Sequence, residues 1–260
     1  MRFMVCLKPV PEPGSVKVDP ETHTLKRESA ALVLNPADRY ALEAAVELKE
    51  KIGAEVVAAM MGPLNAAPLL KEAYACGADK VFLLSDRAFA GADTLATSYV
   101  LSLAARKLGP FEAIFCGKVS IDGETAQVGP ELAAWLGWPS VIWVKEIIPA
   151  KNSWKLVRAT DEGEEVLEVK LPVLMTIEPE SNDPRPPSIK RLLEIMDQEI
   201  PTLSASELEA DPSLLGLGGS PTRVVEIFSP TYEGKREFLE GPPEETVDRL
   251  ISILKERGLI

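Results

Sequence analysis

The stretch from Gly117 to Gly129 (GKVSIDGETAQVG) holds the residue types best able to do chemistry in this chain. It follows an apolar run at 111–116 that is typical of a buried strand, and it precedes a segment at 130–137 with helical apolar spacing. The first N–H groups of a helix lack internal partners and carry the positive end of its dipole, so this arrangement can bind an anion. The polar side chains that could contact a ribose or a phosphate are Asp122, Glu124, Thr125 and Gln127.

Three further polar loops follow or precede predicted elements, at 8–14, 35–38 and 85–98. The carboxyl ends of parallel strands lie at one edge of an open sheet, where such folds bind ligands. Four loops at one edge fit a nucleotide, although each loop also fits an ordinary connection whose polar residues cap a helix.

The elements that must position these loops alternate between strand and helix over the first 140 residues. Predicted strands lie at 3–8, 55–61, 80–84 and 112–116, and predicted helices at 36–51, 66–75, 93–107 and 125–136, with Asn35 and Asp93 as N-caps. Apolar strands joined by helical crossovers predict an α/β fold with a doubly wound, mostly parallel sheet.

The pattern changes after Pro139. Four consecutive strands, at 141–148, 154–160, 164–171 and 173–177, are predicted to be antiparallel additions to the same sheet. A proline-rich stretch, a glycine-rich joint at 216–220 and a helix at 242–257 follow. We therefore predict a nucleotide-binding domain at 1–180 and, at 181–260, an arm that docks on another subunit, with a small lid as the alternative.

Bulk composition excludes several function classes. The net charge is −12 over 260 residues, without a cluster of basic residues, which argues against nucleic acid as a partner. The single histidine, His23, and the three cysteines show no catalytic or metal-binding spacing, so we predict no catalytic side chain and no metal site. No GxGxxG follows the first strand, which argues against a Rossmann dehydrogenase, and no GxxxxGK[ST] occurs, which argues against a P-loop NTPase. Without a signal peptide or an apolar span, the chain is expected to be cytoplasmic.

Motifs along nearly the whole chain resemble the small (beta) subunit of electron transfer flavoproteins. They are VCLKPVP at 5–11, NPADRYALEAA at 35–45, MGP at 61–63, GAD at 77–79, the 117–130 loop, KLP at 170–172 and the 185–196 region. In that family the small subunit has a doubly wound α/β domain and a C-terminal arm that wraps the large (alpha) subunit. Simple electron carriers of the family hold AMP in the small subunit, and electron-bifurcating members hold a second FAD.

The loops at 85–97 and 121–130 are similar to those of the bifurcating branch. By this resemblance, FAD in this chain would take two electrons from NADH. It would pass one to ferredoxin or flavodoxin and the other, through the large-subunit FAD, to an acyl-CoA dehydrogenase or quinone reductase. A non-bifurcating subunit with AMP is the alternative, and a non-redox adenine-nucleotide sensor is an alternative of another class.

The resemblance also implies roles for individual residues. The adenosine pocket would be lined by Cys6, Asn35, Asp38 and Met61. The additional phosphate and ribityl groups of FAD would meet Asp93, Thr94 and Thr97. Ribose and phosphates would be wrapped by Gly117, Lys118, Asp122, Gly123, Glu124, Thr125, Ala126, Gln127 and Val128, with Lys118 as a fixed cation.

Three departures from the family pattern affect these expectations. Val119-Ser120 stands where the family usually has Gln-Ala, so one amide contact is expected to be missing. In the partner-recognition loop Ile189 replaces the usual leucine, and it is predicted to dock in a partner's apolar pocket. The basic residues that often follow are replaced by Glu194, Asp197 and Glu199. The redox chemistry would belong to the cofactor and would need the heterodimer.

Overall fold

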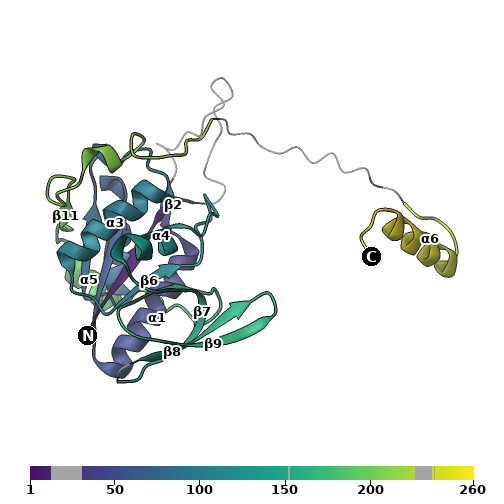
Figure 1. Cartoon of the computed structure of the whole chain (residues 1–260), viewed down its shortest axis with the longest axis horizontal. Coiled ribbons are helices and arrows are strands. Elements are labelled where there is room, and N and C mark those ends of the chain that lie inside the picture. Colours follow the sequence, from purple (N-terminus) through teal and green to yellow (C-terminus); the bar gives the residue numbers. More distant parts are fainter. Residues whose placement is uncertain (13–30, 152, 226–235, 237) are drawn as a thin grey trace. The chain divides into compact units, whose positions relative to one another are not determined.

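The computed structural model describes residues 1–12, 31–151, 153–225, 236 and 238–260, so His23 lies outside the described residues (Figure 1). Contacts group the chain into two compact units, Met1–Glu226 and Ile227–Ile260. Residues 181–226 thus belong to the unit that contains the sheet, and docking of 181–260 on another subunit stays a prediction. In the described part of the chain, no helix is both long and apolar enough to cross a membrane.

The first unit is built on a nine-stranded sheet with the strand order β11-β5-β4-β1-β6-β10-β7-β8-β9. In chain order the strands are β1 (Arg2–Leu7), β4 (Glu55–Met61), β5 (Lys80–Leu84), β6 (Ala113–Gly117), β7 (Ser140–Ile148), β8 (Trp154–Thr160), β9 (Gly163–Val169), β10 (Val173–Ile177) and β11 (Thr202–Leu203). A separate antiparallel pair joins β2 (Pro9–Pro11) to β3 (Leu32–Leu34). The parallel core extends from β11 to β7.

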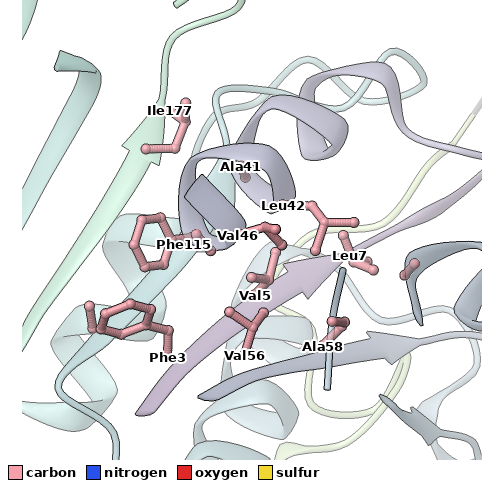
Figure 2. Packing of buried hydrophobic residues seen from close by; sticks show 14 of the residues in the cluster. Phe3, Val5, Leu7, Ala41, Leu42, Val46, Val56, Ala58, Phe115 and Ile177 are labelled. Atoms are coloured by element: carbon pink, nitrogen blue, oxygen red, sulfur yellow. The ribbon is translucent and has the colours of Figure 1, made fainter. Parts of the chain in front are cut away.

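Helices cover both faces of this sheet, as the predicted doubly wound fold requires. They are α1 (Pro36–Ile52), α2 (Ala67–Ala75), α3 (Thr94–Leu108), α4 (Val128–Leu136) and α5 (Ile189–Ile195). On one face Phe3, Val5 and Leu7 pack with Leu42 and Val46 of α1 (Figure 2). The alternate side chains of β1 point to the other face, where they join residues of α3 and α4. The doubly wound prediction is confirmed.

Strand order reverses between β1 and β6. From β1 the chain passes through α1 to β4 and through α2 to β5, and α3 then carries it back across β1 to β6. Loops after β1 and β6 therefore diverge at this switch point, which is the usual ligand-binding position of open α/β sheets. The predicted polar loops at 8–14 and 117–129 begin here.

The prediction of four antiparallel additions is wrong for β10, which is parallel to both neighbours, and holds for β7 only on the side of β8. β10 lies inside the sheet and runs parallel to both β6 and β7, so only the β7–β8 and β8–β9 pairings are antiparallel. All five residues of β10 are buried, whereas β9 is largely exposed. An unbroken apolar strand is more stable between two neighbours than at an edge, which is why the chain returns β10 to the centre.

Some predicted boundaries and side-chain roles also differ. The helix predicted from residue 125 begins at Val128, because Glu124 and Ala126 have left-handed backbones with φ of 48° and 56°. Gly216, in the predicted joint, lies against 88–90: a Cβ there would come within 2.4 Å of the Ala88 oxygen. In the second unit, α6 (Pro243–Glu256) confirms the predicted C-terminal helix.

Candidate nucleotide-binding site

A group of polar residues gathers where strand order reverses. This switch-point cluster comprises Lys8, Asn35, Asp38, Gly117 and Asp122. Asp38, in the first turn of α1, is only 6% exposed and accepts hydrogen bonds from the Lys8 backbone nitrogen at 2.7 Å and from Asn35 Nδ2 at 2.9 Å. Burial raises the pKa of Asp38 to about 7, although these hydrogen bonds and the charge of Lys8 act in the opposite direction.

Gly117 ends β6 directly against the start of α1. A Cβ at this position would lie 2.3 Å from Asp38 Oδ1 and 2.8 Å from the Asp38 nitrogen and the Ala37 carbonyl carbon. No side chain fits there unless helix and strand move apart. The predicted site residue Gly117 therefore lets β6 approach the buried carboxylate closely.

Asn35 ties the loop after β6 to the loop before α1. It occupies the N-cap position of α1 as predicted, but its side chain makes no capping hydrogen bond. Its Nδ2 donates to the Val119 oxygen at 2.8 Å, and its Oδ1 accepts from the Ile121 nitrogen at 3.2 Å. Asn35 thus shapes the predicted phosphate loop from the opposite side of the switch point.

Lys8 completes the cluster, although sequence analysis did not name it as a site residue. Its Nζ donates to Asp122 Oδ1 at 2.6 Å and to Ser120 Oγ at 3.0 Å. Although burial acts to raise the pKa of Asp122, the hydrogen bond and the charge of Lys8 lower it. The signal was present in the sequence, because Lys8 directly follows β1 at the ligand-binding edge.

The rest of the predicted loop, from Gly123 to Val128, carries an unusual backbone. Glu124 and Ala126 both adopt positive φ, which costs non-glycine residues free energy and is most frequent at functional sites. Residues 122–125 are exposed, and the Glu124 nitrogen donates to the Ser120 oxygen at 2.9 Å. Consecutive residues of opposite hand, such as Ala126 and the right-handed Gln127, turn N–H groups toward one side, a geometry that suits anions.

The N-terminus of α3 meets this loop through Thr94. Its hydroxyl lies 3.1 Å from Glu131 Oε1 of α4 and 3.4 Å from Gln127 Oε1. The structure therefore brings Thr94 and Gln127 together, and their contact with a ligand stays a prediction. Thr97 lies one turn further along α3 and is half-buried.

Asp93 uses both carboxylate oxygens within the chain. Oδ1 accepts from the Ala96 nitrogen at 3.1 Å and confirms the predicted N-cap, whereas Oδ2 accepts from the Thr222 nitrogen at 3.1 Å and its hydroxyl at 2.8 Å. Although burial acts to raise the pKa of Asp93, these hydrogen bonds lower it. Asp93 thereby fastens segment 220–222 to the start of α3.

A cavity of about 550 Å³ lies at the carboxyl ends of β4 and β5. This β4–β5 cavity is lined by residues 61–64 and by 85–87, 89 and 90, so it includes the predicted site residue Met61. Leu64 and Phe89 make its wall largely apolar, and Arg87 adds a cation. β4 is the neighbour of β1, so the cavity belongs to the edge of the sheet that carries the switch-point cluster.

Comparison with known proteins identifies this arrangement. A family model described as "Electron transfer flavoprotein domain" matches residues 22–208. The chain belongs to the electron transfer flavoprotein family. It is 43% identical to the electron transfer flavoprotein subunit beta of Thermoanaerobacterium thermosaccharolyticum and 42% identical to that of Clostridium acetobutylicum, with full coverage of each chain. It is also 41% identical, over the full length of both, to the caffeyl-CoA reductase-Etf complex subunit CarD of Acetobacterium woodii.

Two predicted site residues of this electron transfer flavoprotein subunit lie away from the switch-point cluster. Lys118 donates to Glu178 Oε1 at 2.8 Å, and its Nζ lies 4.7 Å from the ring centre of Trp143, so its charge is held on the β7–β10 side. Cys6 is buried on the α3–α4 face of the sheet and contacts Cys116. No group of three or more potential metal-ligating side chains occurs among the described residues.

Proposed function

We propose that this beta subunit holds FAD and acts in electron bifurcation within a heterodimer with the large (alpha) subunit. When bound, FAD would accept two electrons from NADH and release one to ferredoxin or flavodoxin and the other toward the large-subunit FAD. An acyl-CoA dehydrogenase or quinone reductase would receive the latter. The chain's own residues would bind and orient the cofactor.

The contact of Thr94 with Gln127 is the observation that carries this proposal. It joins the start of α3 to the residue before α4, so the N-termini of these two helices lie next to each other. Each N-terminus can stabilise one phosphate group. AMP has a single phosphate, whereas FAD has two, so this paired arrangement favours the dinucleotide.

The β4–β5 cavity gives further support. Its largely apolar wall suits a planar ring system, and its volume of about 550 Å³ falls within the range of small-molecule sites. Met61, which is predicted to line the adenosine pocket, belongs to this wall. A structural AMP would leave such a cavity at the ligand-binding edge without an evident use.

Individual residues then take distinct parts in binding. Asn35, Asp38 and Gly117 fix the shape of the loop after β6, and the left-handed residues Glu124 and Ala126 direct N–H groups to the phosphates. The exposed carboxylate of Glu124 can accept a hydrogen bond from a ribose hydroxyl. Asp93 acts by holding α3 in place, because its oxygens are already occupied.

Two exposed apolar surfaces support protein partners. Helix α6 exposes Val247, Leu250 and Ile251, a face that an arm docked on the large subunit would bury. Ile189, at the start of α5, is 76% exposed and would enter an apolar pocket of the dehydrogenase. The name of the CarD relative, which places that protein in a caffeyl-CoA reductase complex, favours for this chain a partner that acts on CoA esters, as an acyl-CoA dehydrogenase does.

Nucleotide analysis of the heterodimer tests the proposal. The chain should be co-expressed with its large subunit, the purified complex precipitated, and the released nucleotides quantified. We expect two FAD per heterodimer and little AMP. Thr94→Val should lower the FAD content, whereas Thr160→Val, on the β8–β9 hairpin, should leave it unchanged.

The alternatives give different results in the same measurement. One FAD with one AMP would make the protein a simple electron carrier and overturn bifurcation. Adenine nucleotide without any flavin would favour the non-redox sensor. Equal FAD content in Thr94→Val and Thr160→Val would overturn the assignment of the α3 N-terminus to the cofactor.

A further inference from the structure

Helix α5, which carries the predicted docking residue Ile189, has only seven residues. A helix of this length is unstable alone, so its orientation must come from contacts with the rest of the compact unit. Ile195 supplies one contact, because it is buried in the core cluster on the α1–α2 face. Lys71 of α2 supplies another by donating to the Met196 oxygen at 2.5 Å.

Arg185 fixes the chain just before α5. Its guanidinium donates to both oxygens of Glu43, at 2.8 and 3.0 Å, and to both oxygens of Glu50, at 2.6 and 3.0 Å. Its backbone nitrogen also donates to Glu43 Oε2 at 3.0 Å. Glu43 is only 5% exposed, so the planar guanidinium neutralises a charge that would otherwise be buried without a partner.

Arg191 fixes α5 itself against the end of α2. Its Nε donates to the Tyr74 oxygen at 2.8 Å, its Nη2 donates to the Ala78 oxygen, and its guanidinium stacks 4.3 Å from the Tyr74 ring centre. The Ser188 nitrogen donates to the Ala75 oxygen at 3.0 Å. Carbonyl groups at a helix C-terminus lack internal partners, so the Ser188 nitrogen pairs with an acceptor of α2, the Ala75 oxygen, whereas the Tyr74 oxygen also accepts from the Gly77 nitrogen.

The outward side of α5 is apolar. This docking patch consists of Ile189, Leu192, Leu193 and Met196, with exposed fractions of 76, 38, 63 and 52%. Its rim is acidic on balance, because Glu194, Asp197 and Glu199 are exposed beside a single exposed lysine, Lys190. A partner that fits this surface has an apolar pocket with a basic rim.

We propose that Arg185 and Arg191 are positioning residues that hold α5 in the orientation in which the docking patch enters a basic-rimmed pocket of the acyl-CoA dehydrogenase. This inference rests on the proposed docking role of Ile189. In this role the two arginines act through α5, because their contacts join it and the preceding residues to α1 and to the end of α2. They reduce the ordering cost of association, because the patch is already in place before the partner arrives.

The test is steady-state electron transfer from the reduced heterodimer to an acyl-CoA dehydrogenase, with dehydrogenase concentration varied. We expect Arg185→Gln to raise the KM for the dehydrogenase about tenfold, the scale expected when ordering of a segment is added to binding. The kcat and the flavin content should stay unchanged. Amide hydrogen exchange in 186–196 should accelerate, and Arg185→Lys, which keeps the charge but not the planar fork, should rescue only part of the KM.

Matched variants separate the possible failures. Arg158→Gln removes a comparable arginine–glutamate pair on the β8–β9 hairpin and should change neither KM nor exchange in 186–196. If Ile189→Ser and Leu193→Ser leave KM unchanged, or if the wild-type heterodimer shows no saturation with the dehydrogenase, docking through α5 is wrong. If those two variants raise KM and Arg185→Gln does not, only the positioning role is wrong.

A milder variant keeps the test informative where Arg185→Gln fails to fold. Glu50→Gln weakens one side of the arginine cluster and leaves the buried Glu43 paired. It should raise KM by a smaller factor than Arg185→Gln and accelerate exchange in the same amides. Wild-type values for both measurements would overturn the proposal.

Discussion

Replacement of Gly117 by alanine is the sharpest test of how the switch-point cluster is built. The added methyl would lie 2.3 Å from Asp38 Oδ1 and 2.8 Å from backbone atoms of residues 37 and 38, whereas ordinary contact begins at 3.4 Å. The start of α1 and the end of β6 must therefore separate by about 1 Å in a close-packed interior. Overpacking of this kind costs about 1–3 kcal/mol of unfolding free energy.

The expected loss can be measured by thermal unfolding of the heterodimer. For a chain of this size, about 2 kcal/mol corresponds to a fall in Tm of about 4–8 °C. Gly123→Ala in the same loop is the matched control, because its nearest neighbour would be Ser120 Oγ at 3.5 Å and no positive φ is involved. Gly117→Ala should also release bound nucleotide faster. Equal Tm values in the two variants would refute the close-approach argument.

Three further predictions concern the polar contacts. Because burial raises the pKa of Asp38 from 3.8 to about 7, its contribution to stability is full below pH 4 and lost as pH rises through 7. Asp38→Asn should therefore reduce the fall in urea midpoint between pH 5 and pH 8; an unchanged slope would contradict it. Lys8→Met should speed nucleotide release but shift stability by only about 0–1 kcal/mol, because its pair with Asp122 is partly exposed. Thr222→Val should accelerate amide exchange at residues 220–222, because the hydroxyl bond to Asp93 is lost, and should leave the α3 cap intact, because Asp93 keeps its bond to the Ala96 nitrogen. Unchanged exchange at these residues would count against a fastening role for Asp93.

Much of the fold could be predicted because local patterns and packing agree. The segment Pro36–Ile52 combines proline at its first position, a left-handed glycine just after its end and an apolar face, and it forms α1. The misplacement of β10 could have been avoided from the same kind of pattern. Four of the five residues of VLMTI are apolar and none is charged, whereas the preceding strand carries three glutamates, so only the former is typical of a strand buried on both sides.

The candidate site was less predictable because its key contacts join residues far apart in sequence. Asn35 has the pattern of a helix cap, yet its amide binds the backbone of a loop more than 80 positions away. Likewise, nothing local predicts a positive φ at Glu124 or Ala126, since neither is glycine. Such backbone strain is stable only when tertiary contacts impose it.

Asp93 illustrates how the structure changes the interpretation of a residue that the sequence analysis identified. Asp93 was predicted correctly as the N-cap of α3. Its contact with a phosphate group stays a prediction. A carboxylate with a lowered pKa is an anion, and an anion beside a phosphate is unfavourable unless a cation lies between them. Both of its oxygens accept hydrogen bonds from α3 and Thr222. Attraction for a phosphate at this helix must therefore come from the free N–H groups of its first turn, with Asp93 fixing where they point.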